Sequence, residues 1–459
     1  MLQTLKNAWK TKEIRNKILF TLLILLLYRI GTVIPVPFVE ANAFATSITS
    51  GGTILSYMNT LSGGALASAT LFALGVSPYI NASIIIQLLA VVFPKLGEIA
   101  KNDKSKMNLI TRIVTVILAI VTGIGYYFLL ERNGALKKSA QPGEGEIAWL
   151  YAIVIIACYV AGASLIMWLA ERINQKGIGN GISLILFANI LSAVPSFVYQ
   201  LVNIVVTSFG DMSNNRALYG TLSTVFSVLL VALIIGLIVF VIWITGSERR
   251  ISVRYAKQIR GRKMYGGQNQ NLPIKLNMTG VMPIIFASSI VSIVPTILMF
   301  CNVSENNFWN KFFSPEGVFY PIALFLLIIA FAYFYTQITF DPVEVSNRIK
   351  SQGGTIAGIR QGKPTSDFIK SVLHKVTLVG ALFLGFIAVL PTVLGPHCIK
   401  YILQWFSDGM ASPYLIDADV LTNTFTFGGT TLLILVGVVL ETFRELEAQL
   451  TMRNYKGFL

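Results

Sequence analysis

Charged residues are scarce in this sequence. They make up 12% of the 459 residues, whereas 54% are hydrophobic, and soluble domains carry about 25% charged residues. Apolar runs of about 20 residues recur along the chain, which is the length that an α-helix needs to cross a bilayer. The composition therefore excludes an ordinary soluble domain and predicts a protein that crosses a membrane many times.

Residues that build metal and redox sites are also few. The three cysteines, Cys158, Cys301 and Cys398, are far apart in the sequence and form no CxxC pair. Two histidines, His374 and His397, are too few for a histidine-based metal site or a proton relay. We therefore expect neither a metal nor a cofactor.

Catalytic motifs are missing as well. The stretch 358–365 (GIRQGKPT) is similar to a phosphate-binding loop, but Ala357 stands where that motif needs its first glycine, and Pro364 follows Lys363. GIGNG at 177–181 follows an apolar run rather than a strand, and neither HExxH nor GxSxG occurs. We expect no enzymatic activity, so the energy for any transport must come from a partner.

Ten apolar runs predict ten transmembrane helices. They lie at 17–36, 76–94, 109–130, 148–170, 181–206, 221–245, 279–300, 318–340, 371–392 and 427–443. Each is expected to be helical because a bilayer supplies no water to satisfy backbone N–H and C=O groups. Arg29, near the outer end of the first run, is the clearest ionisable residue inside a span. Ion-coupled carriers place Asp, Glu or His near the midplane. The sequence therefore argues against one class of membrane protein, the secondary transporters of small solutes.

The distribution of Lys and Arg predicts the orientation. An even number of spans puts both termini on one side, and the segments on that side hold 29 of the 36 Lys and Arg residues, against six in the opposite loops. Asp and Glu divide almost evenly, so the asymmetry belongs to the positive residues and marks the cytoplasmic side. We therefore expect both termini in the cytoplasm.

Two long polar loops, 246–275 and 341–370, concentrate the positive charge on that side. Two interpretations remain open at this point. The charges either orient the chain against anionic phospholipid, or they bind a polyanionic partner such as ribosomal RNA or an acidic protein surface. The outer loops 131–146 and 393–426 carry no motif that indicates a function.

The stretch 61–93 organises the rest of the chain. It reads LSGGALASATLFALG and then VSPYINASIIIQLLAVVF. The first part would make a helix of about 20 Å, which is too short for a hydrocarbon core of about 30 Å, and Gly75 and Pro78 separate it from a full span. We predict a re-entrant half-helix over 61–74. One long helix kinked at Pro78, or an outer loop packed on the surface, are the alternatives.

This stretch resembles the plug and second span of the SecY family, the channel subunits of bacterial protein translocases. Five further stretches resemble the same family in the family's order, and together they cover almost the whole chain. They are YRIGTVIPVP (28–37), GIGNGISLILFANI (177–190), NMTGVMPIIFASSI (277–290), FDPVEVSNRIKSQGGTIAGIRQGKPT (340–365) and FGGTTLLI (427–434).

The resemblance implies an all-α membrane protein with ten transmembrane helices in two inverted five-helix halves, 1–210 and 211–459, although no residue-level repeat between the halves is visible. It implies a protein-conducting channel that passes unfolded secretory proteins across the bacterial cytoplasmic membrane and releases transmembrane segments sideways into lipid. The implied partners are SecE, SecG, the SecA ATPase, the ribosome, and the precursors of secretory and membrane proteins.

Site residues are carried over from the family by matching motifs. The family's pore ring, an apolar constriction that excludes water, corresponds to Val76, Ile80, Ile182, Leu186, Ile285 and Ile434. The plug corresponds to Ser62, Gly63, Gly64, Ala65, Leu66, Ala67, Ser68, Ala69, Thr70, Leu71 and Phe72. Aliphatic residues in a membrane bundle usually serve packing or lipid contact, which is the alternative for the ring.

The family's lateral gate, between the second and seventh spans, corresponds to Asn81, Gln87 and Ile293. Its contacts with SecA and the ribosome correspond to Arg250, Arg262, Lys263 and Arg360. The sequence departs from the family in places: Val76 and Leu186 stand where isoleucine is common, and Ala357 and Gln361 replace prolines beside Arg360. The last two changes raise the question of how that loop is kept rigid.

Overall fold

The computed structural model describes residues 2–40, 59, 62–137, 148–213, 217–255, 258–260, 263–265, 269–301, 307–313, 317, 319–394 and 428–456. The predicted contact residue Arg262 lies outside these residues, as do most of the two outer loops.

Helices dominate the described chain. They are α1 (Leu2–Lys10), α2 (Lys12–Gly31), α5 (Ser77–Val92), α6 (Pro94–Asn102), α7 (Lys104–Arg132), α8 (Ala148–Lys176), α9 (Gly181–Ser213), α10 (Ala217–Gly246), α11 (Met282–Phe300), α12 (Phe308–Phe313), α13 (Phe319–Thr339), α14 (Pro342–Ser351), α15 (Lys363–Leu394) and α18 (Gly428–Lys456). Each of the ten predicted runs coincides with a helix, namely α2, α5, α7, α8, α9, α10, α11, α13, α15 and α18. The predicted helical architecture is therefore confirmed.

The number of membrane spans is a separate question. Among the described residues, four helical stretches are long and apolar enough to cross a bilayer, at Ser105–Arg132, Trp149–Lys176, Phe319–Ser351 and Lys363–Leu394. A fifth results if α5 and α6, which meet at an angle of 118°, are one broken span. Other apolar stretches are shorter, so ten spans stay a prediction.

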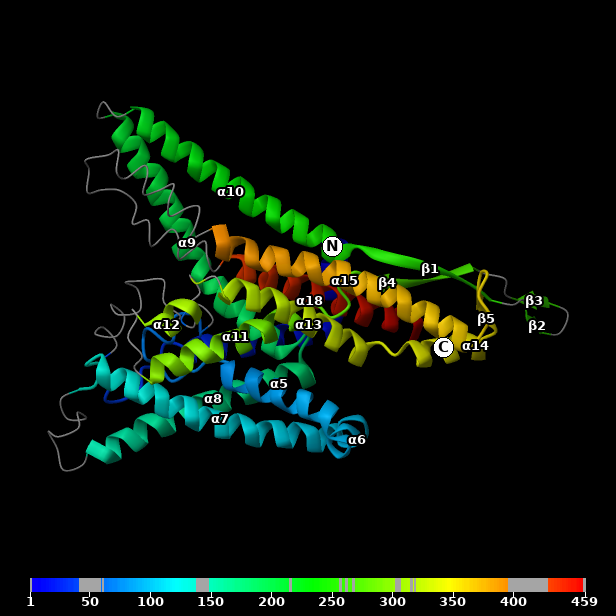
Figure 1. The fold of residues 1–459 in the computed structure, drawn as a ribbon, viewed down its shortest axis with the longest axis horizontal. Coiled ribbons are helices and arrows are strands. Elements are labelled where there is room, and N and C mark those ends of the chain that lie inside the picture. Colours follow the sequence, from blue (N-terminus) through cyan, green and yellow to red (C-terminus); the bar gives the residue numbers. More distant parts are fainter. Residues whose placement is uncertain are drawn as a thin grey trace.

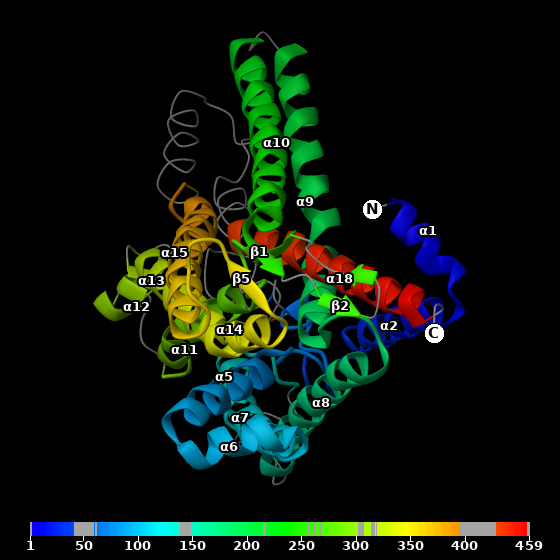
Figure 2. The ribbon, with the colours of Figure 1, turned by 90° about the vertical axis from the view of Figure 1, so that its right-hand side faces the viewer.

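Apart from α9 and α10, the long helices run broadly along the longest axis of the molecule (Figure 1). The helices α9 and α10 pack against each other and project from the other helices, as Figures 1 and 2 both show. On α10, Trp243 is 67% exposed and is accompanied by exposed valines and isoleucines. A helix that is apolar on its outer face suits lipid or another membrane helix rather than water.

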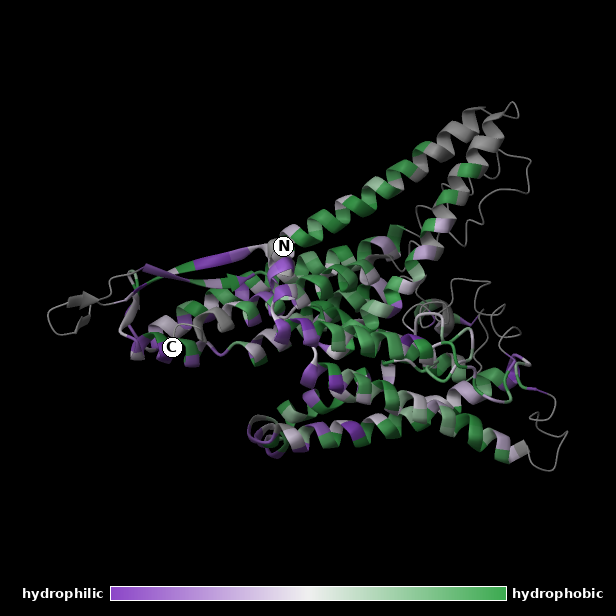
Figure 3. Cartoon of the chain, turned by 180° about the vertical axis from the view of Figure 1, so that it is seen from behind, coloured by the Kyte–Doolittle hydropathy of each residue, from purple (hydrophilic) through white to green (hydrophobic). Residues whose placement is uncertain are grey.

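A small antiparallel sheet closes one end of the bundle. Its strands follow the order β4 (Asn269–Lys275), β1 (Glu248–Tyr255) and β5 (Gly354–Ile356), and a separate hairpin joins β2 (Gln258–Arg260) to β3 (Lys263–Tyr265). On β1, Ile251 and Val253 are buried, and they alternate with Arg250, Ser252 and Arg254, which are exposed. Hydrophilic residues gather at this end, and the long helices are mainly hydrophobic (Figure 3). The two basic loops, expected as separate polar segments, are therefore joined through β1 and β5 into one platform.

The predicted half-helix at 61–74 is wrong in its local structure. Residues 63–76 form successive turns, and helix α5 begins only at Ser77. Gly63, Gly64, Ala69 and Gly75 all have positive φ angles, from 43° to 87°. A right-handed helix needs negative φ at every residue, so these four positions interrupt it.

The first and last helices meet at the same end of the molecule. Thr4 on α1 donates a hydrogen bond to Glu447 on α18 at 3.4 Å, and Lys17 on α2 donates one to Gln449 at 3.1 Å. The two terminal regions therefore lie together at one end of the described helices.

Candidate functional site

The six predicted ring residues all lie in the interior of the bundle. Their exposed fractions are between 1% and 7%, and all six belong to one hydrophobic cluster. The helices that position them contact one another in the sequence α5, α11, α18 and α9. The same cluster includes Tyr28 and Ile166, which are not ring candidates, so burial alone does not separate a ring from ordinary packing, and the ring stays a prediction.

The predicted plug is bound to the chain that follows α2. Leu71 donates a backbone hydrogen bond to the carbonyl of Ile34 at 2.9 Å, and Val36 donates one to the carbonyl of Ala69 at 3.2 Å. The ring of Phe72 stacks on Tyr28, with centroids 5.4 Å apart and planes at 11°. The segment is therefore packed inside the protein rather than lying on its surface.

Arg29, the ionisable residue of the first predicted span, points inward at this segment. Its guanidinium donates a hydrogen bond to the carbonyl of Ala188 on α9. A Cβ atom on Gly63 would stand 2.8 Å from Asn189 Oδ1 and 3.0 Å from an Arg29 nitrogen. Gly63 also has a φ of 70°, which residues with a side chain rarely adopt, so position 63 favours glycine where the plug backbone lies against these two side chains.

Polar residues mark the predicted lateral gate on α5. Gln87 donates a hydrogen bond to Ser83 at 2.9 Å and accepts one from the hydroxyl of Tyr335 on α13. Asn81 Oδ1 is buried and has no hydrogen-bond partner among the described residues. Ile293, 37% exposed, lies on α11, which contacts α5. Sequence reasoning missed Tyr335, because nothing in the local sequence of α13 relates it to Gln87.

Two of the predicted contact residues are exposed on the platform. Arg250, on β1, pairs with Glu248 at 2.7 Å while its side chain remains 67% exposed. Arg360 is exposed in a turn between Gly358 and Gly362, both of which have positive φ angles. Lys263 lies on β3.

Hydrogen bonds hold the Arg360 turn where the family has prolines. Gln361 donates to the carbonyl of Gly354 on β5 at 3.0 Å, and Thr365 donates to the carbonyl of Arg360 at 2.8 Å. Ser346 on α14 donates to the carbonyl of Gly362 at 2.9 Å. These bonds answer the question of rigidity that Ala357 and Gln361 raised.

The base of the platform is joined to the last helix. Arg444 on α18 donates a hydrogen bond to the carbonyl of Thr245, at the end of α10, at 2.6 Å. Burial and the nearby Arg444 charge lower the pKa of Lys275 on β4, although Glu248 opposes this effect. Positive charge is therefore crowded where α10, β4 and α18 meet.

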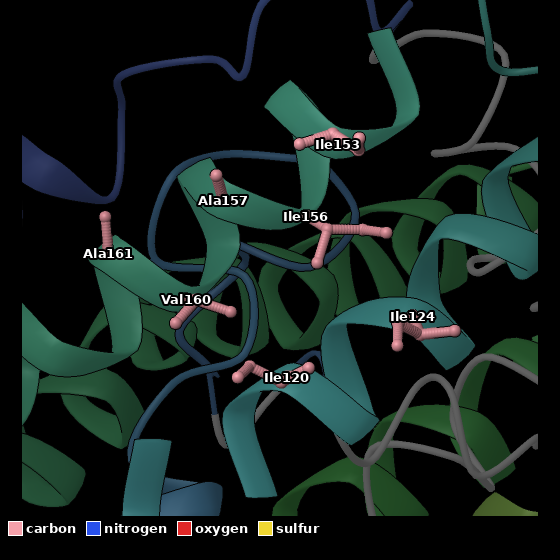
Figure 4. A pocket seen from close by; sticks show the side chains of 7 residues that line it. All are labelled: Ile120, Ile124, Ile153, Ile156, Ala157, Val160 and Ala161. Carbon is pink, nitrogen blue, oxygen red and sulfur yellow. The ribbon is translucent and has the colours of Figure 1, made fainter. Parts of the chain in front are cut away.

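An apolar groove of about 470 Å³ lies between α7 and α8 (Figure 4). It is lined by Ile120, Ile124, Ile153, Ile156, Ala157, Val160 and Ala161. Several of these side chains are exposed on the outside of the bundle, including Ile153 at 56%. The groove offers no polar side chain to recognise a small solute.

No group of three or more His, Cys, Asp or Glu residues able to hold a metal occurs in the part of the chain that the structure describes.

Comparisons with known proteins agree with this architecture. The SecY family model matches residues 70–443. The chain is 38% identical over 477 residues to "Protein translocase subunit SecY" of Streptomyces coelicolor, and 38% identical over 476 residues to the protein of the same name from Mycobacterium bovis. In both comparisons the alignment covers 100% of each chain.

Solved structures share the fold. "The structure of a protein conducting channel" matches with a TM-score of 0.62 and 19% identity, and "Sec61 in the Canine ribosome-channel complex from the endoplasmic reticulum" matches with a TM-score of 0.58 and 17% identity. Each match covers 95% of this chain and 92% of the other. The match of the family model and the full-length identity to two translocase subunits show that the chain belongs to the SecY family.

Proposed function

We propose that this chain is the channel subunit of a protein translocase, through which unfolded secretory proteins cross the cytoplasmic membrane. The observation that carries the proposal is the full-length identity to two translocase subunits. The six predicted ring residues support it, because they are buried together on helices that contact one another in the series α5, α11, α18 and α9, beside a glycine-rich segment packed into the bundle. An apolar constriction excludes water and ions until a polypeptide opens it. A protein with this function needs no reactive side chain of its own.

The route through the protein follows from the positions of these groups. A polypeptide would enter at the end that carries the basic platform, pass the ring and displace the plug. Transmembrane segments would leave between α5 and α11, which contact each other and carry the predicted gate residues Asn81, Gln87 and Ile293. Breaking the hydrogen bond between Gln87 and Tyr335 would accompany this opening.

We propose SecE and SecG as companion subunits and SecA and the ribosome as docking partners on the platform. The support is the name of the relatives, a translocase subunit, and the ribosome-channel complex among the structures of the same fold. Positive side chains such as Arg250 and Arg360 are exposed there and suit acidic protein surfaces or RNA. With that platform on the cytoplasmic side, both termini are cytoplasmic too, and the remaining positive charge contacts anionic phospholipid.

The comparisons give no support to the alternative, a secondary transporter of small solutes. The relatives are translocase subunits, and the groove between α7 and α8 carries no polar group to bind a solute.

Reconstitution tests the proposal directly. The chain would be purified with SecE and SecG, placed in vesicles, and supplied with SecA, ATP and an unfolded secretory precursor. We expect the precursor to become protected from added protease only in vesicles that contain the chain. Protection that is equal without the chain would contradict the proposed function.

A further inference from the structure

The centre of the predicted plug accepts a hydrogen bond from a side chain on helix α7. The hydroxyl of Tyr126 on α7 donates to the carbonyl oxygen of Leu66 at 2.7 Å. Tyr126 is 2% exposed and Leu66 is 3% exposed, so water does not compete for this bond. We propose that Tyr126 is a positioning residue that latches the plug in its closed place; this rests on the proposed function, in which the segment closes the channel.

The latch acts on a carbonyl that is already paired within the plug. Leu66 O also accepts a hydrogen bond from the backbone N–H of Ala69 at 3.1 Å. Removing the Tyr126 hydroxyl therefore leaves no unpaired carbonyl, and the closed plug keeps its own internal structure. Moving the plug away, by contrast, breaks the bond between the two groups. The hydroxyl therefore raises the free energy needed to move the plug away, whereas its removal has a smaller effect on the free energy of unfolding.

The position of Tyr126 is fixed by its neighbours. Its ring meets that of Tyr159 on α8 edge to face, with centroids 4.9 Å apart. Both rings lie in a hydrophobic cluster with the plug residues Leu66 and Ala69. The hydroxyl of Tyr159 is also buried, but it has no hydrogen-bond partner among the described residues. Tyr159 is therefore a matched control: the same side chain, in the same cluster, without the bond to the plug.

A second contact holds the plug by shape alone. A Cβ atom on Gly162 of α8 would stand 1.9 Å from the carbonyl oxygen of Leu71. Helix α8 can lie this close to the plug backbone only with glycine at that position. The variant Gly162→Ala therefore pushes the plug out of place while the Tyr126 hydroxyl remains present.

The test compares three variants in the complex with SecE and SecG. Chloride efflux from reconstituted vesicles, without precursor, measures how often the closed channel opens. A single hydrogen bond of ordinary strength corresponds to a change of about fivefold in such an equilibrium. We expect Tyr126→Phe to raise efflux by about that factor, Tyr159→Phe to leave it unchanged, and Gly162→Ala to raise it at least as much as Tyr126→Phe.

Each other outcome has a distinct meaning. Equal efflux from Tyr126→Phe and Tyr159→Phe would overturn the latch, because packing and not the bond would then matter. An increase with Gly162→Ala but none with Tyr126→Phe would also overturn the latch while keeping the plug as the seal. If neither variant leaks and precursor transport in the same vesicles is normal, both the latch and the plug are wrong but the channel function stands. Tyr126→Phe is conservative, so the test does not depend on whether Gly162→Ala folds.

Discussion

Replacing Ile434 by asparagine is the sharpest test of the pore ring. Ile434 is 1% exposed in the centre of the bundle, on α18. Loss of its apolar burial costs the closed state about 2 kcal/mol, and burial of an unpaired amide costs about 1–3 kcal/mol more. In an open channel filled with water, the amide is hydrated and most of this penalty disappears. A difference of about 3 kcal/mol between the two states corresponds to roughly a hundredfold shift toward opening.

The assay is export of a secretory reporter with a defective signal sequence, in cells that depend on this chain. We expect Ile434→Asn to export it and the parent chain to retain it. Leu433, also 1% exposed, is the matched control. It lies about 100° away around the same helix, so Leu433→Asn should lower the amount of protein without a gain in export.

Two results would refute the reasoning. Ile434→Asn made in normal amounts with no gain in export would remove Ile434 from the ring. An equal gain from Leu433→Asn would show that any polar group in this part of α18 loosens the channel, and that no particular face of the helix forms a constriction.

Two further predictions concern the platform and the gate. Arg360→Glu should leave the protein folded and inserted but block SecA-driven export, because glutamate repels the acidic surface that arginine's five donors bind. The same charge change at exposed Lys350 should have a smaller effect. Unchanged export by Arg360→Glu in vesicles would make Arg360 an ordinary orientation charge. In a chain without its native cysteines, Asn81→Cys with Ile293→Cys should form a disulfide that stops export and membrane insertion until reductant is added, whereas Asn81→Cys with Val294→Cys, turned about 100° around α11, should crosslink less. A high yield of the first crosslink with both activities intact would contradict the lateral gate.

The helical part of the fold could be predicted because its cause is local. Each apolar run forms its own backbone hydrogen bonds, and all ten coincide with helices. The sheet was missed although β1 carries a local signal: Ile251 and Val253 alternate with Arg250, Ser252 and Arg254, which is the period of a strand with one buried face. Its pairing with β5 joins Val253 to Ile356, about a hundred residues away, and no local pattern encodes that contact.

The candidate site divides in the same way. The ring and plug residues were chosen by family motifs, and the structure buries the ring residues together without testing their role. The half-helix expected at 61–74 failed because Ala69, with φ at 43°, joins the glycines in a left-handed conformation that alanine rarely adopts. The contacts of Tyr126 with Leu66 and of Tyr335 with Gln87 join helices distant in sequence. Such partners emerge only when the chain is folded.

The pairing of β5 with β1 has a mechanical consequence. Three residue pairs, from Val253↔Ile356 to Tyr255↔Gly354, join a loop that connects α10 with α11 to a loop that connects α13 with α15. A force applied to either loop is therefore shared by four long helices, all from the second half of the chain. A partner protein that pushes on Arg360 would therefore move the sheet as a unit and not only one loop. The sheet is connected through Arg444 to α18, and α18 carries Ile434.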